Sequence, residues 1–222
     1  MSFQTIVNNA TNITINNNPV TGAVMSRSQR LKTASRGPMI YMFDIAVGRA
    51  FEMNGANRAM LQVLQTTGRT TEEEITLSST AGMGYIMGYA GTISSANLNA
   101  LSISSATSNR FVLDTSGTTG IQASDTIFEV GDYIQPANSR YTYQVKTTVF
   151  GSDIALGLVN VDVNRLIFPS TSDGGVNIVG QGLNVANNCT FHVKCLKMPT
   201  HTIIPGKLFT FDGSFQFVEV IL

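Results

Sequence analysis

The stretch "VGDYIQPANSRYTYQV", residues 130–145, carries the clearest strand-and-turn pattern of the chain. Gly131 and Asp132 predict a turn. Pro136 is expected to end the short apolar run after that turn, because proline cannot donate to a strand ladder. The run that follows alternates, so every second residue lies on one face. The residues expected on that face are Tyr141, Tyr143 and Val145.

The same stretch has a second interpretation, as a binding loop on the rim of a β-domain. Its charged and aromatic side chains could converge on a ligand such as a glycan, although the chain has no Trp to form a sugar-stacking platform. The candidate rim contacts are Asp132, Tyr133, Arg140, Tyr141 and Tyr143. The pattern itself favours a corner between strands.

The neighbouring segments extend the β pattern. Short alternating runs separated by Gly, Asp, Asn and Ser fill residues 110–168 and are typical of a small barrel or sandwich. Before them, residues 78–109 contain no charged side chain and fit closely packed strands and turns. We therefore expect a small β-domain, residues 77–168, inserted into a core made of residues 1–76 and 169–222.

The expected core contains one strand and one helix with strong signals. The run "PMIYMFDIAV", residues 38–47, alternates as a strand that is apolar on one face. The segment "NGANRAMLQVLQTTGR", residues 54–69, predicts the one helix, with Asn54 or Asn57 as its cap and Gly68 past its end. Residues 1–24 are rich in Asn and Thr and suggest an irregular arm or edge strand that needs a partner.

Composition points to a surface that partners cover. Only 13% of the 222 residues are charged while 43% are hydrophobic, and the 14 basic residues balance the 14 acidic ones. This balance gives no general attraction to nucleic acid or to acidic membranes. Four early cations precede every acidic residue and suggest a solvated or interface-facing strand, with a phosphate patch as the alternative. They are Arg27, Arg30, Lys32 and Arg36.

The N-terminus lacks the apolar segment of a signal peptide, and no run approaches the roughly 20 apolar residues of a membrane span. We therefore expect synthesis in the cytoplasm and no span.

No motif predicts catalysis, a cofactor or a metal. Cys189 and Cys195 are expected on one face of a strand, roughly 20 Å apart at about 3.3 Å per residue, which is too far for a disulfide. His192 falls on the opposite face, so these residues do not converge on zinc. The glycines of "GMGYIMGYAG" precede no helix that would hold a phosphate. The acidic run "TEEEI", residues 71–75, is expected to be a solvated loop.

The order of these features resembles a known family. A basic segment "SRSQRLKTASRG" precedes the strand "PMIYMFDIAV" and the helix "NRAMLQVLQTTGR". The inserted domain runs from "EVGDYIQP" to "NVDVNRLIFPS", and "CTFHVKCLKMPTHTIIP" leads to a terminal "GSFQFVEVIL". Over residues 26–222 this layout is similar to the distal tail proteins and related baseplate proteins of long-tailed bacteriophages. The segment "SRGPMIYMF" has one Gly and no Trp where family members often have a glycine pair and a tryptophan. Another ring-forming baseplate component is therefore an open alternative.

The resemblance implies a mainly β fold, with a β-sandwich core that has one helix and carries an inserted small OB-like β-barrel. It implies a structural virion protein, not an enzyme, that forms a ring, commonly of six copies, at the distal end of the tail tube. The ring would join the tube to the baseplate hub and to fibres or receptor-binding proteins. A receptor- or glycan-binding module is the alternative function. We expect the four early cations to make inter-subunit or tube-facing contacts, and the arm 1–24 to order on assembly.

Overall fold

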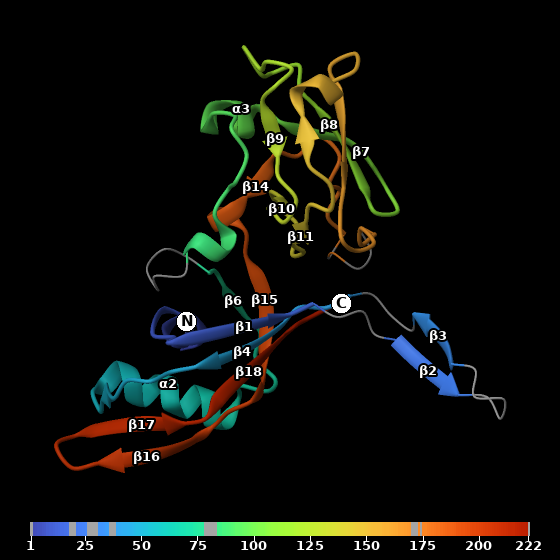
Figure 1. Cartoon of the computed structure of the whole chain (residues 1–222). Helices are drawn as coiled ribbons and strands as arrows, with labels where there is room; N and C mark the ends of the chain where they lie inside the picture. The colour runs from blue at the N-terminus through green and yellow to red at the C-terminus, as the bar shows by residue number, and fades with distance from the viewer. Residues whose placement is uncertain are drawn as a thin grey trace. The chain divides into compact units, whose positions relative to one another are not determined.

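A computed structural model describes residues 2–17, 21–25, 31–35, 39–77, 84–169, 173 and 175–221, with the backbone alone for 21–25 and 31–35. The chain is mainly β, with several antiparallel sheets and few short helices (Figure 1). It divides into two compact units, which are described separately below. The first unit comprises residues 1–74 and 193–221, and the second comprises residues 75–192.

The first unit is built on a five-stranded sheet of order β1-β4-β18-β15-β6. The bounds are β1 Asn12–Asn16, β4 Met42–Ala46, β6 Glu73–Ile75, β15 Phe191–Lys197 and β18 Ser214–Glu219. The strand predicted at residues 38–47 is confirmed, because its expected apolar face is buried. That face includes Tyr41, Phe43, Ile45 and Val47. Strand β18 is the hydrogen-bonded neighbour of β4, and its buried Phe215 and Phe217 lie opposite Ile45 and Phe43, so the two strands share one apolar face.

The predicted helix is also confirmed, as α2 Gly55–Thr66. The Asn54 side chain caps it by accepting a hydrogen bond from the backbone N–H of Asn57. Its apolar stripe is buried against the unit and consists of Met60, Leu61 and Leu64. Gly68 lies just past the end, where a Cβ would come within 2.7 Å of the Leu64 carbonyl oxygen, so only glycine fits there.

Of the two alternatives for residues 1–24, an irregular arm or an edge strand, the described part contains the edge strand, because β1 lies at the edge of the five-stranded sheet. Residues Ser2–Asn8 form helix α1, and β1 pairs with β4 along its full length. The Phe3 side chain is fully buried and stacks on Phe217 with ring centroids 4.9 Å apart. The Phe3 N–H also donates to the Glu73 carboxylate at 3.0 Å. A helix of seven residues is stabilised by packing rather than by its own propensity. Its sequence is too short to show a helical period, so the sequence did not predict it.

Two smaller sheets complete the first unit. Strands β16 Thr200–Ile204 and β17 Leu208–Asp212 form a hairpin that continues to β5 Phe51–Glu52, in the order β16-β17-β5. Helix α2 lies beside this hairpin (Figure 1). Strands β2 Thr21–Met25 and β3 Leu31–Ser35 form a separate two-stranded sheet.

The second unit contains several small sheets. One has the order β13-β8-β7, with bounds Leu158–Asp162, Arg110–Asp114 and Ser102–Thr107. Another has the order β11-β10-β14, with bounds Tyr143–Gln144, Tyr133–Pro136 and Leu183–Val185. A third pairs β9 Thr126–Phe128 with β12 Val149–Phe150. Within the described residues these sheets do not close into a barrel.

Two features of the second unit differ from the expected organisation. The sequence division placed residues 169–192 in the core. In the structure they fall within the second unit, because β14 pairs with β10 of this unit. The charge-free segment 78–109 was expected to hold only strands and turns. Its described part contains helix α3 Ser95–Ala100, capped by the Ser94 side chain, and the single-turn helix η2 Gly84–Met87. Further single turns are η3 Gly151–Asp153 and η5 Ala186–Asn188.

Candidate interaction surfaces

The corner predicted at residues 130–145 is confirmed, and it is structural. Gly131 has a positive φ of 99°, which favours glycine, and β10 ends at Pro136. The Asp132 side chain is 3% exposed. Its two carboxylate oxygens accept hydrogen bonds from the N–H groups of Ala90 and Glu129, each at 2.9 Å. Burial raises the pKa of Asp132 above its ordinary value. Asp132 therefore ties two loops together inside the unit.

The tyrosines proposed as rim contacts lie in the core. Tyr133, Tyr141 and Tyr143 are 6%, 0% and 1% exposed. The Tyr143 hydroxyl accepts a hydrogen bond from the backbone N–H of Phe168 at 3.1 Å. The Arg165 guanidinium lies 5.2 Å from the Tyr143 ring centroid. Because their rings face other core side chains, these three tyrosines do not form an exposed platform for a sugar.

Arg140 makes its contact elsewhere in the second unit. Its backbone N–H donates to the Asp173 carboxylate at 2.8 Å. Asp132 instead binds the backbone of Ala90 and Glu129. The hydrogen bonds of these two predicted rim residues thus go to different segments.

The predicted basic interface lies almost wholly outside the described residues. Arg27, Arg30 and Arg36 are not described. Lys32 is described by its backbone alone, in β3 opposite Val24. The assignment of these four cations to an interface stays a prediction.

The described side chains form no cluster suited to a metal. Within that part of the chain, no three His, Cys, Asp or Glu residues come together. Cys189 and Cys195 are free, buried thiols, in agreement with the predicted absence of a disulfide. Burial raises the pKa of Cys195 to about 11, so this thiol stays protonated at neutral pH. No described helix is long and apolar enough to cross a membrane.

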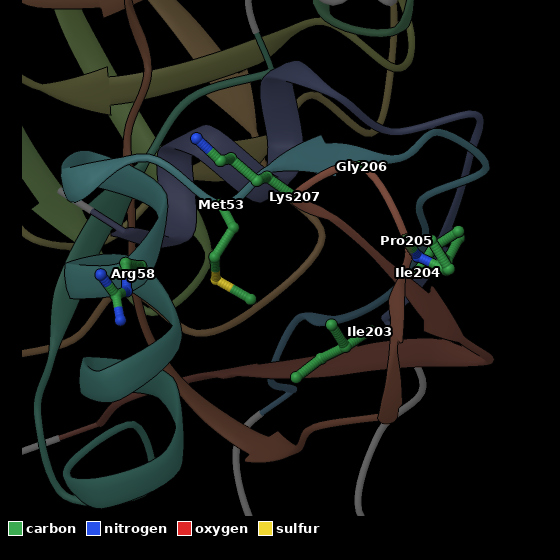
Figure 2. Close-up of a pocket in the computed structure, with 7 residues that line it drawn as sticks. All are labelled: Met53, Arg58, Ile203, Ile204, Pro205, Gly206 and Lys207. Carbon is green, nitrogen blue, oxygen red and sulfur yellow. The ribbon is translucent and has the colours of Figure 1, made fainter.

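An apolar concave surface lies in the first unit, between α2 and the β16–β17 hairpin. Figure 2 shows Met53 and Ile203 facing this space, with Arg58 on the helix and Lys207 in the hairpin turn. The hollow has a volume of about 640 Å³. It continues along α2 past Leu61. Its lining is mostly apolar, so it suits another apolar surface better than a polar ligand.

Two features of this groove are informative. Ile203 is 67% exposed, although it lies in a strand beside other apolar residues. Lys207 has a positive φ of 62°, and its carbonyl oxygen accepts a hydrogen bond from the Met53 N–H at 2.6 Å. This bond fixes the hairpin turn against the start of α2. The turn signal "PGK" was visible in the sequence, but nothing there indicated that a helix would lie beside it.

Among the known proteins, no family model matches this chain, and a search of curated proteins finds none with significant sequence similarity.

Proposed function

We propose that this chain is a structural protein of a bacteriophage tail that associates with copies of itself into a ring at the distal end of the tail tube. The ring, of six copies in this proposal, joins the tube to the baseplate hub and to peripheral fibres or receptor-binding proteins. The protein acts through its contacts and not as an enzyme. It is assembled in the host cytoplasm and works in the virion.

The observation that carries this proposal is the separate hairpin β2–β3. Its two strands pair with each other over five residues and with no other described strand. An isolated two-stranded hairpin is only marginally stable in water, whereas pairing or packing on a further surface stabilises it. A neighbouring copy in a ring supplies such a surface. The hairpin also includes Lys32, and the sequence places the other three early cations around it.

The finer architecture belongs to the same proposal. The sheets of the first unit, together with α2, are assigned to a β-sandwich that forms the ring. The small sheets of the second unit are assigned to a domain of the OB-like kind that extends to a neighbouring component. The low share of charged residues supports extensive subunit contacts, because the centres of interfaces are poor in charge.

Removing the hairpin tests this proposal. Asn16 and Met42 are register partners in β1 and β4, so the chain ends left by the removal lie close together. Residues 18–38 can therefore be replaced by a four-residue Gly-Ser linker without stretching the sheet. We expect the intact protein to form a discrete oligomer in solution and the shortened one to be a monomer that still unfolds cooperatively.

Replacing the four early cations by alanine is the matched variant that keeps the hairpin. Loss of the oligomer in both variants assigns the interface to the cations, and loss only in the shortened protein assigns it to the hairpin backbone. Mass photometry and sedimentation velocity measure the mass. An intact protein that stays monomeric at every concentration contradicts the proposal.

A further inference from the structure

The second unit carries an exposed apolar projection at the turn between Ala155 and Leu158. These two residues bond to each other through both backbone pairs, at 2.8 and 3.0 Å, and leave a two-residue loop. Leu156 in that loop is fully exposed, at 102%. Leu158, which closes the loop, is 39% exposed. We call Leu156 and Leu158 the apolar knob.

The backbone of the knob is unfavourable for the residue it carries. Leu156 and Gly157 both have positive φ, 53° and 76°. A hairpin loop with two positive φ values favours Asn-Gly or Asp-Gly, because a left-handed conformation is costly for other side chains. The local backbone therefore does not explain why a leucine occupies this position. It neither packs in the unit nor suits its turn, and contact with another molecule would account for it.

Hydrogen bonds fix the backbone that leads into the knob, and the segments on either side of it are acidic. The N–H of Gly151 donates to the Asp125 carbonyl oxygen, and the Asp153 carboxylate accepts from the Phe150 N–H, both at 2.8 Å. Asp114 lies opposite Leu158 in the β8–β13 register. The segments that form and flank the knob, residues 111–126 and 147–158, hold these three aspartates and no Lys or Arg. A partner surface should therefore be apolar with a basic rim.

The groove of the first unit has this chemistry. Its apolar lining is Met53, Leu61, Ile203 and Ile204, and its charged lining residues are Arg58 and Lys207. Among the residues that the structure describes, no acidic side chain lines it. Neither cation forms an ion pair with any residue that the structure describes. The groove thus offers the complement of the knob in both apolarity and charge.

We infer that the apolar knob of one molecule inserts into the groove between α2 and the β16–β17 hairpin of a second copy. Leu156 contacts Met53 and Ile203 of that copy, and Asp153 faces Arg58 or Lys207. The contact is head-to-tail, because knob and groove are different surfaces, and such contacts close into rings or extend as filaments. This inference rests on the proposed self-association and adds a second contact to that of the β2–β3 hairpin, so stable association needs both.

Disulfide trapping between two variants tests the contact directly. One protein carries Leu156→Cys and the other carries Ile203→Cys. We expect a covalent 1:1 dimer when the two are mixed under mild oxidation and none from either protein alone. The native thiols are a built-in control, because Cys189 and Cys195 are 0% and 2% exposed and the unaltered protein should not cross-link.

Leu156→Asn separates binding from folding. Asparagine suits this turn better than leucine, so the unfolding temperature should not fall. The loss of one buried leucine should weaken association about 10- to 100-fold. Leu166→Asn is the matched control, because Leu166 is also exposed, at 62%, and lies outside the knob. It should leave association unchanged.

Mixing defective variants gives a third readout. Leu156→Asn retains a groove, and Ile203→Asp retains a knob, so their mixture can form one contact per pair. We expect 1:1 dimers from the mixture and monomers from each protein alone. If the unaltered protein forms an oligomer that neither variant weakens and no cross-link appears, the knob–groove contact is wrong while the proposed ring stands. An unaltered protein that is always monomeric overturns both.

Discussion

Replacing Phe3 by alanine should destabilise the first unit by about 3–5 kcal/mol, the range typical for a buried phenylalanine. The Phe3 side chain is 0% exposed and its ring stacks on Phe217. Removing it leaves a cavity against β18, and the lost ring pair contributes about 0.5–1.5 kcal/mol of that effect. Helix α1 has too few residues to persist without this contact.

Hydrogen exchange read by mass spectrometry suits this measurement, because it follows each unit separately as urea is added. Peptides that cover β4 and β18 should lose protection at a lower urea concentration in Phe3→Ala, while peptides from β8 and β13 keep theirs. Thr14→Ala is the control, since Thr14 lies in the same N-terminal region but is exposed. A change below about 0.5 kcal/mol, typical of a surface substitution, would mean that the N-terminus is a loose arm after all.

Three further changes have defined outcomes. Because burial raises the pKa of Asp132, the folded state holds its proton more tightly than the unfolded chain, so this group makes the free energy of unfolding fall as pH rises from about 4. Asp132→Asn lacks this titration, so the stability advantage of the unaltered protein over the variant should shrink as pH rises. Urea titrations at several pH values can measure this advantage. Gly151→Ala should destabilise the second unit by more than about 2 kcal/mol in the same titrations, because its Cβ would collide with the Gln122 carbonyl oxygen. Arg110→Ala should change the unfolding free energy little, because its ion pair with Asp162 at 2.6 Å is partly solvent-exposed and screened by salt.

Each of these changes has a matched comparison. Gly55→Ala is the control for Gly151→Ala, because a Cβ at Gly55 meets nothing within 4 Å and alanine favours the helix. Adding salt should remove most of the Arg110 effect and leave the Gly151 effect intact. An Asp132→Asn difference that stays constant with pH would mean that this carboxyl does not titrate differently on unfolding.

The strands and the helix were predictable where a periodic pattern spans enough residues. Residues 38–47 alternate over ten positions, and α2 has both a cap and an apolar stripe. Helix α1 and helix α3 have only seven and six residues, so long-range packing decides them and no period could reveal them. The boundary of the second unit was unpredictable for the same reason. Only the long-range pairing of β14 with β10 assigns residues 169–192 to that unit.

The candidate site residues were harder to predict, because polarity in a sequence does not reveal which side of a strand faces the core. Asp132, Tyr133, Tyr141 and Tyr143 have the chemistry of a binding loop, yet their hydrogen bonds and ring contacts lie inside the unit. The groove, in turn, depends on α2 and the β16–β17 hairpin lying side by side, although they are about 140 positions apart in the sequence.

A more useful sequence signal is a residue that breaks the rule of its own local structure. "ALGL" would read as an ordinary tight turn if Asn stood at Leu156, and leucine there is disfavoured by both its backbone and its exposure. Local rules are most often broken where function demands it. The proposed contact makes this explanation testable, because Leu156→Asn should satisfy the turn and weaken association in the same molecule. If it changed stability alone, the leucine would be an unfavourable surface residue with no partner.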